Sequence, residues 1–286
     1  MPDTLESIMA ELRSRINTED TSTRVSREEV ESLKQQTVVV MPAGGKGTRL
    51  RTETDNKSIN KAMISIDGRE SIIQRTVREY ASFGLRKFVI LTGFMADKVE
   101  KHLGNGSTWS VEIAYSEDPE GRKVGNAGAI LNALDNGILD DMMVSIVHNP
   151  DDMIVGLDRP YGDIFLEGHI KGRKNGCIST FVVVPETPFQ YSGMIIENGK
   201  VSDITKYPPI AVPAHTGITM FDPECYRYFR RLVTLERETS FENVVSPVLA
   251  GEGRLFAINI PSEVWIPVND LKGIERAKSA LEQFKT

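Results

Sequence analysis

Apolar residues recur along the first half of the chain in two patterns that alternate. Short runs rich in β-branched residues have the length of buried strands. Between these runs, apolar side chains return every three or four residues, which predicts helices. Strands that alternate with helices form a parallel sheet covered on both faces. The strands expected are 37–42, 87–92, 111–115 and 143–148, and the helices expected are 70–83, 95–103 and 126–136.

The second half has a different pattern. Its extended runs are shorter and are broken by glycine and proline, which favours a mixed or antiparallel sheet around a substrate pocket. No internal repeat and no second domain boundary is visible, so residues 37–286 are predicted to form one α/β domain. The extended runs are 178–184, 193–196, 199–204 and 214–221. Helices at 223–233 and 241–250, a strand at 254–260 and a last helix at 270–284 complete it.

Residues 1–36 are predicted to form a helical extension. Asp3 with Glu6, and Ser26 with Glu29, have the spacing of capping boxes that begin two helices. The segment carries no chemical motif. We therefore expect it to pack against the domain or against another subunit of a homo-oligomer.

Composition and charge exclude several classes of protein. The chain of 286 residues has a net charge of −6, which argues against a nucleic-acid-binding surface. No apolar run approaches the ~18–20 residues that span a bilayer, and no secretory leader is visible. Two cysteines, Cys177 and Cys225, cannot build a disulfide framework. A cytoplasmic protein without a membrane segment is expected.

A glycine-rich segment follows directly after the first predicted strand. Glycines at the carboxyl end of a buried strand let backbone N–H groups approach an anion closely. Between Lys46 and Lys61 five cations face two anions, an excess that suits an anionic ligand. The segment reads Ala43, Gly44, Gly45, Lys46, Gly47, Thr48, Arg49 and Leu50, with Lys61 eleven residues after its end.

The glycine spacing of this segment differs from that of two other phosphate-binding loops. Gly44 and Gly45 are adjacent, so the dinucleotide spacing is not met, and no Gly-Lys-Ser/Thr closes a Walker loop. A tight turn or a solvated charged loop is the structural alternative. Thr48 and Arg49, followed by Lys61, supply a hydroxyl and two cations, which favours binding of a nucleoside triphosphate.

Two further segments bear on the chemistry. Asp151 and Asp152 follow the apolar run 144–148. A carboxylate at the end of this predicted strand lies at the sheet edge, where Mg²⁺ could bind. A helix cap or a turn has the same signature. Gly125, Asn126 and Ala127 open an apolar helix with small residues. Small residues leave room for a flat heterocycle on the backbone, or for close helix packing.

These segments together resemble the sugar-phosphate nucleotidylyltransferases, a family that includes glucose-1-phosphate thymidylyl- and uridylyltransferases and mannose-1-phosphate guanylyltransferases. The family signature reads G-G-x-G-T-R-L followed by P-K-P-M, and residues 60–63 keep the lysine and the methionine of its second half. The resemblance implies a Rossmann-like (glycosyltransferase-A-type) domain with a mixed central sheet. It also implies transfer of NMP from an NTP to a sugar 1-phosphate, with Mg²⁺ as cofactor.

The resemblance assigns roles to single residues. Arg49 and Lys61 would be catalytic, and residues 43–48 with Gly125, Asn126 and Ala127 would hold the nucleotide. Asp151 would be one metal ligand, with Asp152 in reserve, and Asn269 or Asp270 the other. Gly193 and Lys206 would bind the acceptor.

Departures from the family pattern leave alternatives open. Thr205 stands where a glutamate normally holds sugar hydroxyls, which suggests a cytidylyltransferase-like enzyme for a polyol or amino-alcohol phosphate. Asn60, Pro150 and Pro267 also replace usual residues, so a non-catalytic sensor of sugar nucleotides is a second alternative. A glycosyltransferase is disfavoured because no Asp-x-Asp follows the 143–148 strand.

Overall fold

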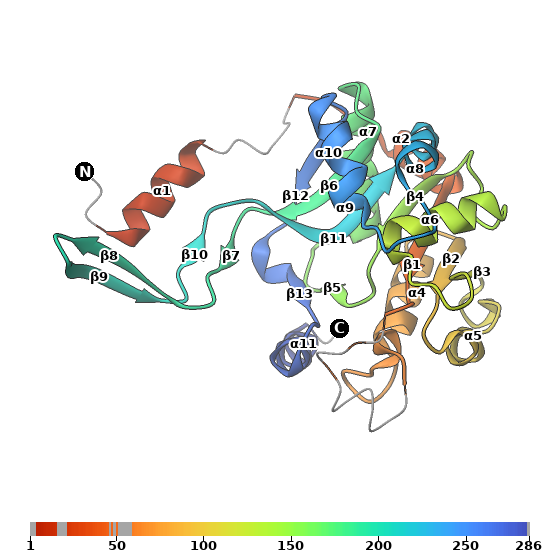
Figure 1. Cartoon of the computed structure of the whole chain (residues 1–286), viewed down its shortest axis with the longest axis horizontal. Coiled ribbons are helices and arrows are strands. Elements are labelled where there is room, and N and C mark those ends of the chain that lie inside the picture. Colours follow the sequence, from red (N-terminus) through yellow and green to blue (C-terminus); the bar gives the residue numbers. More distant parts are fainter. Residues whose placement is uncertain (1–3, 16–21, 46, 48–49, 51–58, 285–286) are drawn as a thin grey trace.

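A seven-stranded mixed sheet forms the centre of the computed structural model, which describes residues 4–15, 22–45, 47, 50 and 59–284 (Figure 1). The strand order is β12-β6-β11-β4-β1-β2-β3. Strand β11 is antiparallel to both of its neighbours, and the other pairs are parallel. The predicted α/β fold with a mixed central sheet is confirmed. The strands are β1 Thr37–Pro42, β2 Lys87–Thr92, β3 Glu112–Glu117, β4 Val144–His148, β6 Ser179–Val184, β11 Ala214–Phe221 and β12 Leu255–Asn259.

Helices cover both faces of the sheet, as the alternating pattern predicts. Val39 and Met41 of β1 belong to a core cluster with α2, α4, α5 and α7, whereas Val38 and Val40 belong to a second cluster with α6, α8, α9 and α10. The alternation follows from the two-residue period of a strand. The helices are α1 Leu5–Arg15, α2 Arg27–Gln35, α4 Ile72–Ser82, α5 Ala96–Leu103, α6 Gly125–Asp135, α7 Tyr161–Lys174, α8 Tyr226–Leu232, α9 Phe241–Val244, α10 Ser246–Gly251 and α11 Leu271–Gln283.

Several short elements complete the fold. Strands β5 Asp152–Ile154 and β13 Trp265–Pro267 pair with each other beside the main sheet. Four 3₁₀ turns are described, at Lys61–Met63, Ser107–Trp109, Pro223–Cys225 and Ser262–Val264. Among the described residues, no helix is long and apolar enough to cross a membrane.

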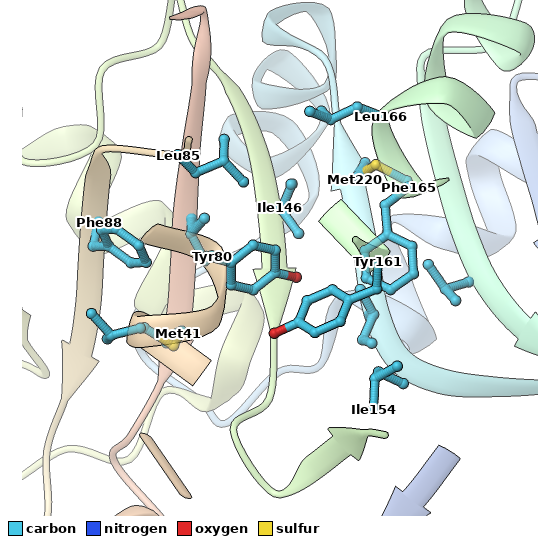
Figure 2. Packing of buried hydrophobic residues seen from close by; sticks show 14 of the residues in the cluster. Met41, Tyr80, Leu85, Phe88, Ile146, Ile154, Tyr161, Phe165, Leu166 and Met220 are labelled. Carbon is cyan, nitrogen blue, oxygen red and sulfur yellow. The ribbon is translucent and has the colours of Figure 1, made fainter. Parts of the chain in front are cut away.

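An aromatic cluster lies on one face of the sheet, in the same core as Met41 of β1 and Ile146 of β4 (Figure 2). The rings of Tyr80 and Tyr161 meet edge to face with centroids 5.0 Å apart, and Phe165 packs on Tyr161. Both tyrosines are buried, and the burial raises the pKa of each phenol. Such edge-to-face pairs add to the area that the rings bury.

Helix α7 is missing from the sequence-based prediction. Its segment contains three glycines, which are poor helix formers. The structure explains two of them by close packing: a Cβ on Gly168 would lie 2.4 Å from Ile258, and one on Gly172 would lie 3.0 Å from Phe256. Both neighbours belong to β12. The glycines therefore let the helix approach the sheet edge closely.

A β-arm projects from the end of the main sheet (Figure 1). It consists of the short pair β7 Thr187–Pro188 and β10 Pro209–Ile210, followed by the hairpin of β8 Ser192–Glu197 and β9 Lys200–Lys206. Helix α1 packs on the hairpin, where the backbone N–H of Leu5 donates to Asp203 at 3.0 Å. The two helices of the extension thus separate: α1 packs on the arm, and α2 begins at the predicted Ser26 capping box and packs against α7.

Candidate active site

Three distant segments meet at the carboxyl ends of β1 and β4. The Lys61 ammonium donates to Asp151 Oδ2 and, at 2.9 Å, to Asn269 Oδ1. Lys61 and Asp151 keep only 18% and 21% of their side-chain surface exposed. These residues line a cavity of about 390 Å³ together with Pro42, Ala43, Gly44, Gly45, Asn60, Ala62, Asn149, Pro150 and Asp152. The structure thus brings three predicted site residues together beside the glycine segment.

Asn60 holds the Lys61 segment against the glycine segment. Its side-chain N–H₂ donates to the carbonyl oxygens of Ala43 and Phe94, each at 2.7 Å, and its oxygen accepts from the N–H of Ala62 at 2.9 Å. The residue is 1% exposed. Asn60 replaces the first proline of the resembled signature, and proline has no such side-chain groups. Sequence reasoning treated Asn60 only as a departure and missed this positioning role.

Asp151 is tied to the segment that carries Asn269. The N–H of Val268 donates to the Asp151 carbonyl at 2.7 Å, and Pro267 pairs with Asp152 between β13 and β5. Asp270 has a different position: its Oδ1 accepts from the N–H of Gly273 at 2.7 Å and caps α11. Two residues were predicted as the second metal ligand. Asn269 contacts Lys61, whereas Asp270 caps the N-terminus of α11.

Asp152 is buried beneath the cavity. The indole N–H of Trp265 donates to its Oδ1 at 3.1 Å, and Asn149 donates to its Oδ2 at 3.2 Å. Burial, with a further contribution from the Asp151 charge, raises the pKa of Asp152 to about 8. A Cβ on Gly217 would lie 2.1 Å from the same carboxylate, so only glycine fits there.

His148 anchors the loop that carries Asp151. One ring nitrogen, Nε2, lies 2.8 Å from the Asp152 carbonyl, and Nδ1 lies 2.8 Å from the Tyr80 hydroxyl. A carbonyl can only accept, so Nε2 carries the hydrogen and Nδ1 accepts from Tyr80. Burial lowers the pKa of His148 to about 4, which keeps the ring neutral. The bond to Tyr80 thereby joins the Asp151 loop to the aromatic cluster, in which Figure 2 labels Tyr80.

The remaining predicted nucleotide-binding residues, together with the predicted catalytic Arg49, divide into three groups. Gly47 is described and has a φ of 62°, whereas Lys46, Thr48 and Arg49 lie outside the described residues. Gly125 and Ala127 lie in the first turn of α6 and contact Thr239: the N–H of Ala127 donates to the Thr239 carbonyl, and Gly125 packs against the Thr239 backbone. The Asn126 side chain accepts from the N–H of Phe241 at 3.0 Å and donates to Glu242 at 3.0 Å, and these bonds hold the first turn of α9.

The predicted acceptor residues lie on the β-arm. Gly193 is in β8, where a Cβ would meet Pro208 at 2.8 Å and Leu5 at 3.1 Å. Lys206 is exposed at the end of β9, with its ammonium 5.1 Å from the centre of the Tyr207 ring. Neither residue lines the cavity around Lys61.

Gly44 also lines a second cavity, of about 690 Å³. Its lining includes Gly93 and Asp118, and Gly44 and Gly93 touch so closely that a Cβ on Gly93 would lie 3.3 Å from the Cα of Gly44. Partial burial and the nearby Glu117 raise the pKa of Asp118 to about 6. Sequence reasoning did not identify this carboxylate, because nothing in its local spacing marks it.

The raised pKa of Asp118 predicts how stability depends on pH. The folded state disfavours the charged form, so stability falls as the pH rises from about 4 through 6. In D118N this loss is absent. We expect D118N to be more stable than the wild type by about 1 kcal/mol at pH 8, a value reduced for solvent screening. Urea unfolding at several pH values measures the gap, which should close towards pH 4, and a gap that does not change with pH contradicts the assignment.

Comparison with known proteins adds to this geometry. A family model described as nucleotidyl transferase matches residues 38–283. The chain belongs to the nucleotidyl transferase family. The match includes the glycine segment, Lys61, Asp151 and Asn269, so all parts of the candidate site lie within the nucleotidyl transferase region.

Curated relatives and a solved structure agree with the family. A UTP–glucose-1-phosphate uridylyltransferase from Synechocystis sp. is 26% identical over 79% of this chain and 58% of that protein. The mannose-1-phosphate guanylyltransferase catalytic subunit beta of Danio rerio is 24% identical over 80% of this chain and 60% of that protein. This nucleotidyl transferase chain thus spans about three fifths of the length of these relatives. A UDP-glucose pyrophosphorylase solved with UDP-glucose has the same fold, with a TM-score of 0.64 and 18% identity over 86% of this chain and 98% of that one.

Proposed function

We propose that this chain transfers a nucleoside monophosphate from an NTP to the phosphate of a sugar 1-phosphate and releases pyrophosphate. The observation that carries the proposal is the meeting of Lys61, Asp151 and Asn269 in one cavity with Gly44 and Gly45. The relatives named as sugar-1-phosphate uridylyl- and guanylyltransferases support the same reaction class.

The residues of the chain suit this reaction because transfer at phosphorus depends mainly on positioning and on charge. The backbone N–H groups of the glycine segment would bind the triphosphate, and Arg49 would neutralise the departing pyrophosphate. Lys61 would bind the α-phosphate. A phosphate oxygen of the acceptor would then attack the α-phosphorus, and the bond to the pyrophosphate oxygen would break.

The oxygen atoms beside Lys61 fit Mg²⁺. A hard divalent cation prefers carboxylate and amide oxygens, and in phosphate sites it uses one or two carboxylates together with phosphate oxygens and water. Asp151 and Asn269 offer such oxygens, whereas the described part of the chain contains no cluster of three histidine, cysteine or acidic residues that could form an all-protein cage. Bound there, Mg²⁺ would stabilise the negative charge that develops at phosphorus.

The acceptor would bind in the same cavity, because its phosphate must reach the α-phosphorus beside Lys61. Gly193 and Lys206 were predicted to bind the acceptor, but both lie on the projecting arm and outside the lining of that cavity. The relatives named as glucose-1-phosphate and mannose-1-phosphate nucleotidyltransferases favour a sugar 1-phosphate as the acceptor.

Pyrophosphate release tests the proposal directly. We expect one productive pair when ATP, GTP, CTP, UTP and dTTP are each combined with a panel of sugar 1-phosphates and polyol phosphates in the presence of Mg²⁺. Chelation of the metal should stop the release. The matched control is D151N, measured with the same pairs. Release no greater than that of D151N with every pair contradicts the proposal.

A further inference from the structure

The Lys61 ammonium lies between the two oxygen atoms that suit a divalent cation. Its Nζ donates to Asp151 Oδ2 and to Asn269 Oδ1, the latter at 2.9 Å. A divalent cation held by these two oxygens would compete with Nζ for the space between them. The ammonium and the cation therefore exclude each other from this position.

Charge favours the same exclusion. Lys61 and Asp151 are both largely buried, so water screens the ammonium only in part. A divalent cation placed beside the ammonium would be repelled, and it would compete for the carboxylate that the ammonium already holds. Without the Lys61 ammonium beside it, the Asp151 carboxylate would attract the cation. The ion pair with Lys61 neutralises most of that charge, so the attraction is weak.

A triphosphate can release this pairing. Its oxygens are anionic and would offer the ammonium a new partner on the glycine side of the cavity. The Asn60 bonds fix the backbone beside Lys61, so the movement required is confined to the lysine side chain. A lysine stem with four methylene groups allows such a movement without a change of fold.

We propose that Lys61 blocks the cation site in the nucleotide-free protein and opens it when a triphosphate draws the ammonium away. The inference rests on the proposed function, and it makes metal loading dependent on the nucleotide. By linkage, the metal would in turn tighten binding of the nucleotide. A free divalent cation would then not occupy the site ahead of the substrate.

Mn²⁺ binding to the nucleotide-free protein tests the inference, since free Mn²⁺ is counted directly by electron paramagnetic resonance. We expect K61M to bind Mn²⁺ at least about ten-fold more tightly than the wild type, within the usual range of coupling between sites. K61Q, which keeps a polar end without charge, should behave in the same way if K61M folds poorly. Mg²⁺ should displace the bound Mn²⁺.

Two further variants locate the ion and control for charge. In K61M/D151N the tight binding should disappear, because the carboxylate is lost. K171M removes a similar lysine, whose Nζ lies 3.3 Å from Glu167 on α7 at comparable exposure, and it should bind Mn²⁺ as the wild type does. Equal affinity of wild type, K61M and K61Q overturns the inference, and so does tight binding retained in K61M/D151N.

The experiment also separates this inference from the proposed function. Mn²⁺ binding requires no nucleotide, acceptor or turnover, so it can support the blocked site even if no substrate pair releases pyrophosphate. Conversely, strong pyrophosphate release with equal Mn²⁺ affinities would keep the proposed function and remove the role of Lys61 as a block.

Discussion

Exchange of Asp151 for asparagine is expected to lower kcat for pyrophosphate release by about 10²–10³-fold, the usual loss when a group that stabilises transition-state charge is removed. Asp151 provides the carboxylate that faces Lys61, and asparagine keeps its shape without its charge. The backbone bond from Val268 to the Asp151 carbonyl remains in the variant, so the loop should keep its position. Steady-state assays with the productive substrate pair, at saturating Mg²⁺, measure the loss.

D158N provides the matched control. Asp158 is exposed seven residues further along the chain, and its exchange changes the net charge by the same amount. We expect D158N to retain wild-type kcat. If D151N also stays within about five-fold of the wild type, a loss that one weakened interaction can explain, Asp151 does not act on the reaction.

Exchange of Gly125 for alanine is expected to destabilise the fold by about 3 kcal/mol or more, since it combines backbone strain with a steric clash. Gly125 has a φ of 73°, and a Cβ there would lie 2.4 Å from the Thr239 carbonyl oxygen. Two backbone bonds hold Thr239 at this place, from its N–H to Val124 and from Ala127 to its carbonyl, at 2.8 Å and 3.0 Å. The clash is with backbone, which cannot rotate away.

The chain offers a control that separates the two causes. Gly137 has nearly the same φ, 68°, but a Cβ there meets nothing within 4 Å. G137A should therefore lose only the roughly 1 kcal/mol that a left-handed backbone costs an alanine. Urea unfolding of both variants gives the difference, and equal losses would show that the contact with Thr239 carries no energy.

Most of the regular elements could be predicted from sequence because burial in a covered sheet leaves a strong pattern. Strand β1 is apolar from Val38 to Pro42, since its alternate side chains enter two different core clusters. Helix α4 has a single buried face with a matching polar one. Helix α7 could not be recognised, because its glycines are explained by contacts with β12, about ninety residues later in the chain.

The residues of the candidate site could be predicted only where they lie in local motifs. Lys61 and Asp151 follow recognisable segments, and the structure places both in one cavity, while their catalytic and metal-binding roles stay predictions. Asn269 and Asp270 are both good helix caps, so the sequence alone could not distinguish their positions. In the structure Asn269 faces Lys61 and Asp270 caps α11, and the metal role of either residue stays a prediction. Asn60 was missed as a positioning residue, since its side-chain bonds reach Ala43 and Phe94, which are distant in the sequence. The raised pKa of Asp118 was missed because its partial burial leaves no local pattern in the sequence. Arg49, Lys46 and Thr48 stay predictions.

The sequence separation between the site residues has a consequence for folding. Lys61 is 90 residues from Asp151 and 208 residues from Asn269. Contacts across such long loops carry a large entropic cost and form late. During synthesis Asn269 leaves the ribosome long after the strands β1 to β4, so the early half of the sheet can assemble before Lys61 and Asp151 meet Asn269. Completion of this three-residue contact would therefore mark the end of folding, and a partly folded chain would lack it.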